Sequence, residues 1–495
     1  MGEELDGTFP DGELAAAAEI GAITDRSARI WVRQPDRDRV PIRLGVDGRE
    51  PVTGSATVSA ESDWTGVAEL ALPDPAPERP FTVTVDDRRL SGRFAPAAGA
   101  HVDFTFGFGS CNHPFEPGPD GRIELNDAAP IYPAMVDELT AADARFLLLI
   151  GDQIYSDEID SISIRDHLPG DDEHPPPLEV AVRAYRRVAR GYLGQSGFRR
   201  LRESIPTLCM WDDHDIFNDW GSRLKESPLD RLLFRAAGQV YREYQHGRNP
   251  INLTPGDAPP YTYFFPFGTA GYLVLDLRGA RDYTEGRLLG RQQWEIVRAF
   301  LHGAVAGTLH TLFVVASVPI AHFSRWLVEA LQRWPGQHAD DVRDRWCSRA
   351  FVASRDEFLD ELFAWQTAEP HRQAIVLSGD VHVASAFTIF NRNGPGVVQQ
   401  FTSSAFTTPC IGFERHLNKI GTLAPNLFEP RLRLRRHFVT LENNYGRVRV
   451  QALPAGGHRV EFAVGAWHPK QQRLVHGGRV VVTPTGTETA ESGVP

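Results

Sequence analysis

The chain has 495 residues, 42% of them hydrophobic, which exceeds the usual size of one domain and is enough to bury a sizeable core. Its 64 acidic and 52 basic residues give a net charge of −12, and no run of Lys or Arg marks a nucleic-acid surface. No apolar run approaches the roughly 20 residues of a membrane-spanning helix. The charge disfavours an electrostatic nucleic-acid binder, but a nuclease that reaches phosphates through metal ions remains compatible.

The cysteines and the first residues bear on the compartment. Four widely spaced cysteines form no Cys-x-x-Cys, so neither a zinc knuckle nor a disulfide scaffold is indicated, although one bridge is compatible (Cys111, Cys209, Cys347, Cys410). The acidic start has no basic region and only a four-alanine run, where a secretory segment needs about 7–15 apolar residues. We expect a cytoplasmic protein for the chain as written, or an exported one if a signal had been removed.

Residues 1–98 alternate between apolar and polar side chains in short runs separated by turn-rich joints. This pattern predicts a β-sandwich of six or seven strands. The segment contains no cluster of ligand-type residues, so we interpret it as a module for packing or for orienting the substrate. Residues 95–100 read as a linker.

From residue 104 onward, apolar runs alternate with amphipathic stretches, which predicts a layered α/β domain over residues 101–485. Helical patterns cover 131–143, 179–205, 228–245 and 290–301, with the apolar stripe of the second at Val180, Ala184, Val188 and Tyr192. The last third is rich in strands and predicts a second sheet facing the first. Residues 166–179 read as a surface loop and 486–495 as a disordered tail.

Four apolar runs end in residues of the types that bind metals. The run 146–150 is followed by Gly151 and Asp152, and similar runs end in TLCMWDDHD (207–215), IVLSGDVH (375–382) and FTFGFGSCN (104–112). Because the carboxyl ends of parallel strands meet at one edge of a sheet, we expect their carboxylates, histidines and thiol to converge. A convergence of anionic donors on rigid supports predicts a metal cluster.

These motifs resemble those of the alkaline phosphatase D (PhoD-like) group of the calcineurin-like metallophosphoesterases. The matching pieces are FGSCN, GDQIY, WDDHD followed by Asn218, and SGDVHVAS, in that order. The resemblance covers roughly the whole chain. It implies an α/β fold, a four-layer α-β-β-α sandwich with metals at one end of the paired sheets, preceded by a fibronectin-like β-sandwich, and it implies a bacterial hydrolase.

The resemblance also assigns roles to individual residues. The metal ligands that it implies are Cys111, Asp152, Tyr155, Asp213, Asn218, Asp380 and His382. Asp152 would bridge two metals, because an anion is needed between cations about 3.5–4 Å apart. His214 would be catalytic and face the substrate together with Asn112. Asp212 would orient its loop, and Asp219 departs from the second asparagine of the relatives. His322 reads as a solvent-facing loop residue, with a role as ligand or substrate contact as the alternative.

The predicted activity is metal-dependent hydrolysis of small phosphoesters, monoesters or diesters, by a metal-activated hydroxide that attacks phosphorus in line. The resemblance implies at least two metals, Fe³⁺ and Ca²⁺, with Zn²⁺ or Mn²⁺ as alternatives. A phospholipase D-like or nucleic-acid diesterase is the alternative within catalysis, although no nucleic-acid or membrane surface is evident. A metal-bound binding protein without turnover is the contrasting class, and the complete ligand set beside His214 argues against it.

Overall fold

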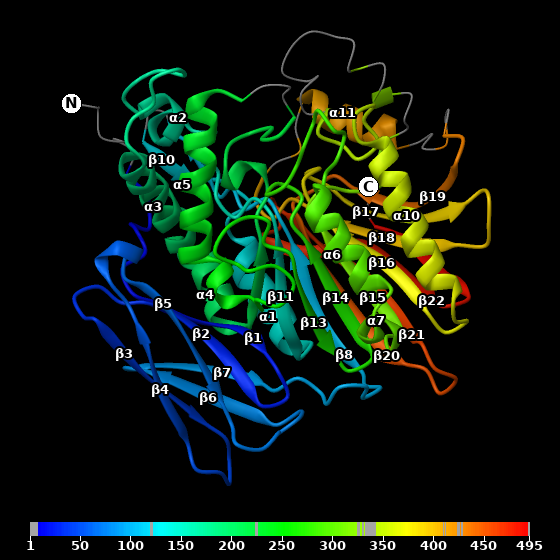
Figure 1. Ribbon diagram of the computed structural model, residues 1–495, viewed down its shortest axis with the longest axis horizontal. Coiled ribbons are helices and arrows are strands. Elements are labelled where there is room, and N and C mark those ends of the chain that lie inside the picture. The colour runs from blue at the N-terminus through cyan, green and yellow to red at the C-terminus, as the bar shows by residue number, and fades with distance from the viewer. Residues whose placement is uncertain are drawn as a thin grey trace.

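A computed structural model describes residues 8–118, 122–222, 226–323, 327–328, 331, 343–408, 410, 412–422, 426 and 429–493. Two parts follow each other along the chain. A small β-sandwich, drawn in blue in Figure 1, comes first and lies beside a larger layered domain of helices and sheets.

The N-terminal sandwich consists of two antiparallel sheets, ordered β1-β2-β5 and β4-β3-β6-β7. Its strands are β1 (Ala17–Ile23), β2 (Ser27–Arg33), β3 (Arg39–Gly45), β4 (Val52–Thr57), β5 (Thr65–Ala71), β6 (Pro80–Val85) and β7 (Arg88–Arg93). In β3, Val40, Ile42 and Leu44 are buried while Arg39, Pro41 and Arg43 are exposed, because successive side chains of a strand point to opposite faces. The predicted sandwich is therefore present, with seven strands.

The first large sheet has seven strands in the order β12-β11-β8-β20-β21-β22-β23. They are β8 (Phe104–Gly109), β11 (Ala144–Ile150), β12 (Thr207–Met210), β20 (Asn444–Ala452), β21 (His458–His468), β22 (Arg473–Thr483) and β23 (Gly486–Ser492). Strands β8, β11 and β12 are parallel, and the C-terminal strands continue the sheet antiparallel.

The second large sheet has the order β13-β14-β15-β16-β18-β17-β19. Its strands are β13 (Tyr263–Phe267), β14 (Ala270–Leu275), β15 (Thr311–Ala316), β16 (Gln373–Ser378), β17 (Ala384–Asn391), β18 (Val397–Ser403) and β19 (Leu432–Thr440). Four of them, β14, β15, β16 and β18, are parallel. A separate two-stranded hairpin joins β9 (Phe115–Pro117) to β10 (Ile123–Leu125).

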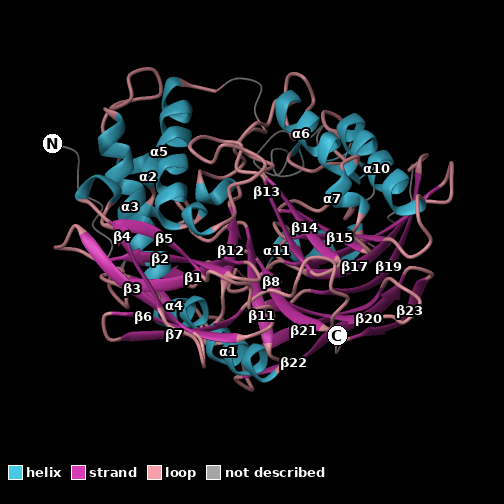
Figure 2. Cartoon of the chain, turned by 60° about the horizontal axis from the view of Figure 1, so that its bottom comes forward, coloured by secondary structure: helices cyan, strands magenta, loops and turns pink. Residues whose placement is uncertain are grey.

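The two large sheets pack face to face, with helices on their outer faces (Figure 2). Between the sheets, the Phe106 ring of β8 meets those of Tyr272 and Phe313, with centroids 5.3 and 5.4 Å apart. On the other face of β15, Leu312 and Val314 pack in a second core that includes α6 and α10. This arrangement is the predicted four-layer α-β-β-α sandwich.

Helices flank the two large sheets (Figure 2). The described helices are α1 (Ile131–Ala141), α2 (Ile164–His167), α3 (Leu178–Gly194), α4 (Ser196–Ser204), α5 (Pro228–Tyr244), α6 (Arg291–Leu301), α7 (Ala304–Gly307), α10 (Val352–Thr367) and α11 (Gly412–Gly421). None of the helices in the described part of the chain is long and apolar enough to cross a lipid bilayer.

Two predictions about elements were wrong. The helix predicted over 179–205 is two helices, because the Gln195 backbone leaves the helical region and its side-chain oxygen caps α4 by accepting from Phe198 N–H at 2.7 Å. The tail predicted to be disordered from residue 486 forms β23, which pairs with β22 through residue 492. Alternation is weak in β23, where Thr489–Ser492 are exposed, so its pairing was not visible in the sequence. Residues 494–495 lie outside the described residues.

Candidate metal centre

The carboxyl ends of the parallel strands of both large sheets meet at one rim. Each of these seven ends is followed within three residues by a polar side chain of the candidate site: Cys111 after β8, Asp152 after β11, Asp213 after β12, Arg278 after β14, Ser317 after β15, Asp380 after β16 and Ser404 after β18. The strands therefore act as rigid supports that bring together residues far apart in the sequence.

Cys111, Asp152 and Tyr155 lie together on one side of the rim. The Cys111 Sγ is 3.4 Å from Asp152 Oδ2 and 3.1 Å from the Ser404 hydroxyl, which also accepts the backbone N–H of His382 at 3.0 Å. The Tyr155 hydroxyl is 3.0 Å from that of Thr408. Thr408 in turn donates to the carbonyl oxygen of Cys111 at 3.0 Å, so Cys111, Asp152 and Tyr155 are brought to one place, with the backbone of His382 beside them.

A buried arginine organises the carboxylates on the other side. Arg278 donates from Nε to Asp212 Oδ1, and its Nη2 lies 3.1 Å from Asp213 Oδ1 and 3.7 Å from Asp380 Oδ1. It also holds Asp344 through two contacts of 2.7 and 2.9 Å. Asp213 Oδ2 accepts the backbone N–H of Asp219 at 2.8 Å, so both Asp213 oxygens already have protein donors.

The carboxylate cluster fits bound cations. Ligand atoms of Asp152, Asp212 and Asp213 all lie within 4.8 Å of one another. The buried Oδ1 of Asp152 and Oδ2 of Asp212 accept no hydrogen bond from the described residues. Burial and the charge of Asp213 raise the pKa of Asp152 well above its usual value, and burial raises the pKa of Asp212 to about 6 despite Arg278. A cation would relieve this repulsion and satisfy both oxygens.

The thiol of Cys111 and the phenol of Tyr155 also fit a bound cation. Burial, and then the charge of Asp152, raise the pKa of Cys111 well above its usual value. Burial and the neighbouring Cys111 raise the pKa of Tyr155 in the same direction. Burial beside Asp152 thus disfavours the thiolate and the phenolate, and a bound cation would favour these anionic forms.

Several of these residues hold an unusual backbone. Cys111, Asp152, Asp219, Asp380 and His382 all have positive φ, between 53° and 68°. Residues other than glycine adopt this left-handed region at a cost of about 1–2 kcal/mol each. Such strain persists only where the surroundings determine it, and it is typical of functional sites.

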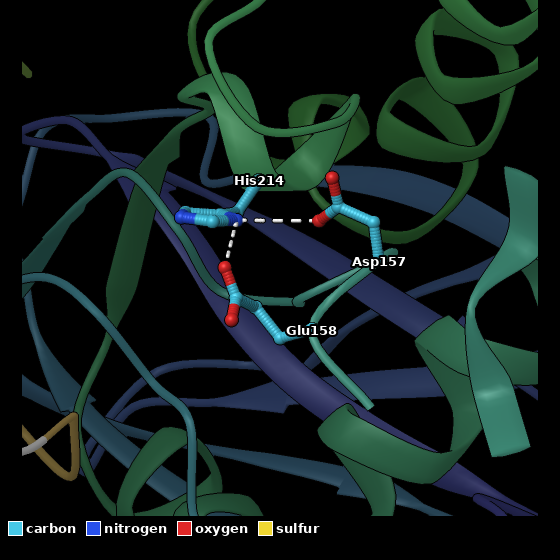
Figure 3. A group of neighbouring side chains, drawn as sticks. All are labelled: Asp157, Glu158 and His214. Atoms are coloured by element: carbon cyan, nitrogen blue, oxygen red, sulfur yellow. Dashed lines mark hydrogen bonds and ion pairs between the residues drawn. The ribbon is translucent and has the colours of Figure 1, made fainter. Parts of the chain in front are cut away.

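His214 projects from the short helix η3 (Asp213–Asp215) and stacks on Tyr155, with ring centroids 4.2 Å apart. Its Nδ1 is 3.3 Å from Asp157 Oδ1 and 3.7 Å from Glu158 Oε1, and Figure 3 shows the other ring nitrogen pointing away from both carboxylates. Burial alone would lower the pKa of His214, but the hydrogen bond with Asp157 and the charges of Asp213 and Asp152 raise it well above its usual value.

The remaining predicted residues occupy defined places. The amide of Asn112 donates to Gln153 O at 2.8 Å and accepts from the Tyr132 hydroxyl, so it anchors its loop, and its predicted substrate contact stays a prediction. Asn218 donates its backbone N–H to Asp157 at 2.7 Å. The prediction of a solvent-facing His322 was wrong: it is 2% exposed and 2.6 Å from Asn418 Oδ1, because α11 covers its loop.

Sequence reasoning missed several neighbours of the site. Arg278, Asp344, Asp157 and Asp215 received no role, and neither did His113, whose ring stacks on Tyr155 with centroids 4.5 Å apart. Burial, with a smaller effect from His214 and His382, lowers the pKa of His113 to about 3. Arg278 could have been found by the same rule as Asp152, since it follows a buried apolar strand.

The fold and the rim define a class: a layered sandwich of the metallophosphoesterase type with its polar centre at the carboxyl ends of the parallel strands. The family model described as PhoD-like phosphatase matches residues 110–452. The chain therefore belongs to the PhoD-like phosphatase family.

Individual relatives agree with this placement. The chain is 23% identical to alkaline phosphatase D of Bacillus subtilis (strain 168) over 192 residues, which is 38% of this chain and 30% of that protein. It thus spans less than a third of that relative in the alignment. The solved structure of PhoD superimposes with a TM-score of 0.69 at 16% identity, covering 97% of this chain and 92% of that one. Purple acid phosphatase PPD1 of yellow lupin (Lupinus luteus) shares the fold, with a TM-score of 0.57 at 11% identity, over 95% of this chain and 74% of that one.

Proposed function

We propose that the protein is a metal-dependent phosphoester hydrolase. The observation that carries the proposal is the buried donor set at the rim, in which Asp152 Oδ1 and Asp212 Oδ2 have no hydrogen-bond donor among the described residues. Metal ions bound there would hold the phosphoryl group and lower the pKa of a water molecule.

Two sets of ligands support two metals. Cys111, Tyr155 and His382 would share one metal with Asp152, and Asp213, Asn218 and Asp380 would share the other with it. Asp152 lies between the two sets, 3.4 Å from the Cys111 sulfur and within 4.8 Å of the Asp213 ligand atom, which suits a bridging carboxylate. The geometry adds Asp212 as a further candidate for the second set, because its Oδ2 is not used by the protein.

His214 would act on the leaving group. The carboxylates of Asp157 and Glu158 hold its Nδ1, so the proton on Nε2 is presented on the opposite side of the ring (Figure 3). The hydrogen bond with Asp157 raises the pKa of His214 and so favours the protonated imidazole that a donor to the departing oxygen requires. Stabilisation of negative charge on the phosphate is the alternative role.

The chemistry of the two sets suggests different metals. A thiolate, a carboxylate and a phenolate suit Fe³⁺, whereas carboxylate and amide oxygens suit Ca²⁺. Zn²⁺ is the competitor at the first position, with Mn²⁺ as a further alternative. Phenolate or thiolate bonded to Fe³⁺ gives a visible charge-transfer band, and Zn²⁺ gives none because its d shell is filled.

The colour of purified protein separates these metals. Aerobically purified protein should be coloured, Tyr155→Phe should shift or weaken the band, and Cys111→Ala should alter it separately. Cys209→Ala, which removes a buried thiol of β12 outside the cluster, is the matched control and should leave the band unchanged. Colourless, active protein with stoichiometric zinc would contradict the iron assignment.

The hydrolase proposal is tested with two artificial substrates on protein of measured metal content. Nitrophenyl phosphate reports monoester hydrolysis and bis-nitrophenyl phosphate reports diester hydrolysis. The ratio of the two turnover rates therefore shows which kind of small-molecule ester the enzyme prefers. Turnover of neither ester, nor of phospholipid or nucleic-acid diesters, by fully metallated protein would instead indicate a binding protein that keeps the ligands without catalysis.

A further inference from the structure

Two loops carry the carboxylates of the candidate metal centre, and both begin in extended or strained backbone. Asp152 has a φ of 56° and directly follows Gly151 with a φ of 120°. Asp212 is extended, with φ −138° and ψ −165°, and precedes η3. Neither loop is part of a sheet or a long helix, so other contacts must fix the positions of Asp152, Asp212 and Asp213.

One carboxylate oxygen contacts both loops. Asp215 Oδ2 accepts the backbone N–H of Asp152 at 2.9 Å and the backbone N–H of Asp212 at 3.0 Å. Asp215 is 3% exposed, and its carboxylate accepts from the backbone N–H groups of Asp152 and Asp212 and from the amide of Gln245. It therefore joins the end of β11 to the end of β12 through backbone N–H groups.

The other oxygen of Asp215 is held from outside the loops. Gln245, which follows α5 and is 4% exposed, donates from Nε2 to Asp215 Oδ1 at 3.2 Å. The Oε1 of Gln245 accepts no hydrogen bond from any described residue. The amide of Gln245 could thus rotate by half a turn and present an acceptor to Asp215.

The segment around Gln245 is itself fixed by the N-terminal sandwich. Trp31 Nε1 donates to Glu243 O at 2.7 Å, and Arg29 donates to Gly247 O at 3.0 Å. Arg248 forms a buried ion pair with Glu19 of β1. The sandwich therefore holds the turn from which Gln245 reaches Asp215.

We propose that Asp215 is a positioning residue for the metal centre: it locks the Asp152 and Asp212 loops together and is itself fixed by Gln245, on a turn anchored by the N-terminal sandwich. Asp215 acts as a hydrogen-bond acceptor and does not contact metal or substrate. The inference deepens the proposed function, since it concerns the same centre, but its main test is metal affinity.

The experiment compares Asp215→Ala with Asp215→Asn in the full chain, stripped of metal and titrated with Zn²⁺ against a chromophoric chelator. Asp215→Ala should weaken Zn²⁺ binding about 10–100-fold, as loss of a partner behind the ligands does. Asp215→Asn should keep most of the affinity, because its amide oxygen can accept both N–H groups while its NH₂ donates to a rotated Gln245. With nitrophenyl esters, kcat of Asp215→Ala should fall while KM changes little.

Three outcomes contradict the proposal. One is Zn²⁺ binding by Asp215→Ala that equals that of the wild type. Another is Zn²⁺ binding by Asp215→Asn as weak as that of Asp215→Ala, which would mean that the charge of Asp215 matters and its hydrogen bonds do not. If Asp215→Ala does not fold, Gln245→Leu decides, since it removes only the outer contact: weakened Zn²⁺ binding with native circular dichroism supports the proposal, and unchanged binding overturns it. Wild-type protein that binds Zn²⁺ but hydrolyses no ester would refute the proposed function and leave this comparison intact.

Discussion

At the scale of single residues, the bridging role proposed for Asp152 gives the most direct prediction. Asp152→Asn nearly preserves shape but removes a negative charge from between the two ligand sets. Turnover should fall by several orders of magnitude and metal content should drop, while the fold is retained because the backbone contact with Asp215 stays. Metal analysis and ester hydrolysis measure both effects, and a fully metallated, active variant would refute the assignment.

His214 gives a second prediction at this scale. His214→Ala should lower kcat by about 10²–10⁴-fold with both metals still bound, because we propose that the residue is a proton donor or charge stabiliser and not a ligand. Esters with leaving groups that need no protonation separate the two roles. If such esters restore the rate, His214 is the general acid, whereas an equal loss for all esters favours charge stabilisation. Loss of metal from the variant would show that it is a ligand.

Single residues also show which parts of the site the sequence motifs could predict and which they could not. Apolar runs that end in Asp, His or Cys led to Cys111, Asp152, Asp213 and Asp380. This worked because the carboxyl ends of parallel strands meet at one edge of a sheet, independently of the conformation of the loops that follow. The roles of Arg278 and Asp215 depend on partners from other strands, at 3.1 Å to Asp213 and 2.9 Å to the Asp152 N–H. No local pattern encodes such distances, so the roles of both residues required the three-dimensional structure, although the position of Arg278 just after a buried strand was visible in the sequence.

At the scale of elements, histidines gather at the end of the sheets opposite the metal centre. His458 begins β21 and lies between two threonine hydroxyls, with Nδ1 2.8 Å from Thr311 and Nε2 3.2 Å from Thr269. The rings of His101 and His310 are 4.8 and 6.0 Å from it. Burial, helped by these two histidines, lowers the pKa of His458 to about 3.

This histidine should make the fold sensitive to acid. A histidine in the unfolded chain titrates near about 6.5, so the unfolded state binds a proton that folded His458 does not. The stabilisation is complete above about pH 6.5 and is lost toward pH 3, at about 1.4 kcal/mol per pH unit for this one group. The free energy of unfolding, measured with urea, should fall less between pH 7 and pH 5 for His458→Gln than for the wild type. Equal slopes would contradict the pKa direction.

The elements themselves were largely predictable, with two informative exceptions. Alternation marked β3, and continuous apolar runs marked β11, β15 and β16, because those strands are buried on both faces. The break between α3 and α4 depends on the capping contact of Gln195, and β23 gains its place only by pairing with β22. Both depend on interactions that hydrophobic periodicity does not record.

At the scale of the whole molecule, the sandwich and the layered domain share a buried ionic cluster. Glu19, which is fully buried, pairs with Arg202 of α4 at 3.0 Å and with Arg248. These arginines lower the pKa of Glu19 although burial opposes them. The Arg248 guanidinium also lies 4.9 Å from the centre of the Trp31 ring. These buried contacts join the sandwich to the domain that carries the candidate metal centre. Removing one partner would leave a buried charge unpaired, which strongly destabilises the fold.

Glu19→Gln tests this junction. It leaves two buried arginines without their counter-charge, and breaking a buried pair costs about 3–5 kcal/mol. The free energy of unfolding in urea should fall by that order. Glu69→Gln is the matched control, since Glu69 faces Arg29 at 3.9 Å with about half of its side chain exposed, and such surface pairs contribute about 1 kcal/mol or less. Equal effects of the two changes would contradict a tight junction.

For the whole molecule, we propose that hydrolysis of phosphoesters depends on bound metal ions. The measurement that tests it is hydrolysis of bis-nitrophenyl phosphate by one preparation before metal removal, after removal with a chelator, and after each candidate metal is restored. The account predicts that activity disappears with the metals and returns when they are restored, in proportion to the metal bound. Undiminished turnover by metal-free protein would contradict it.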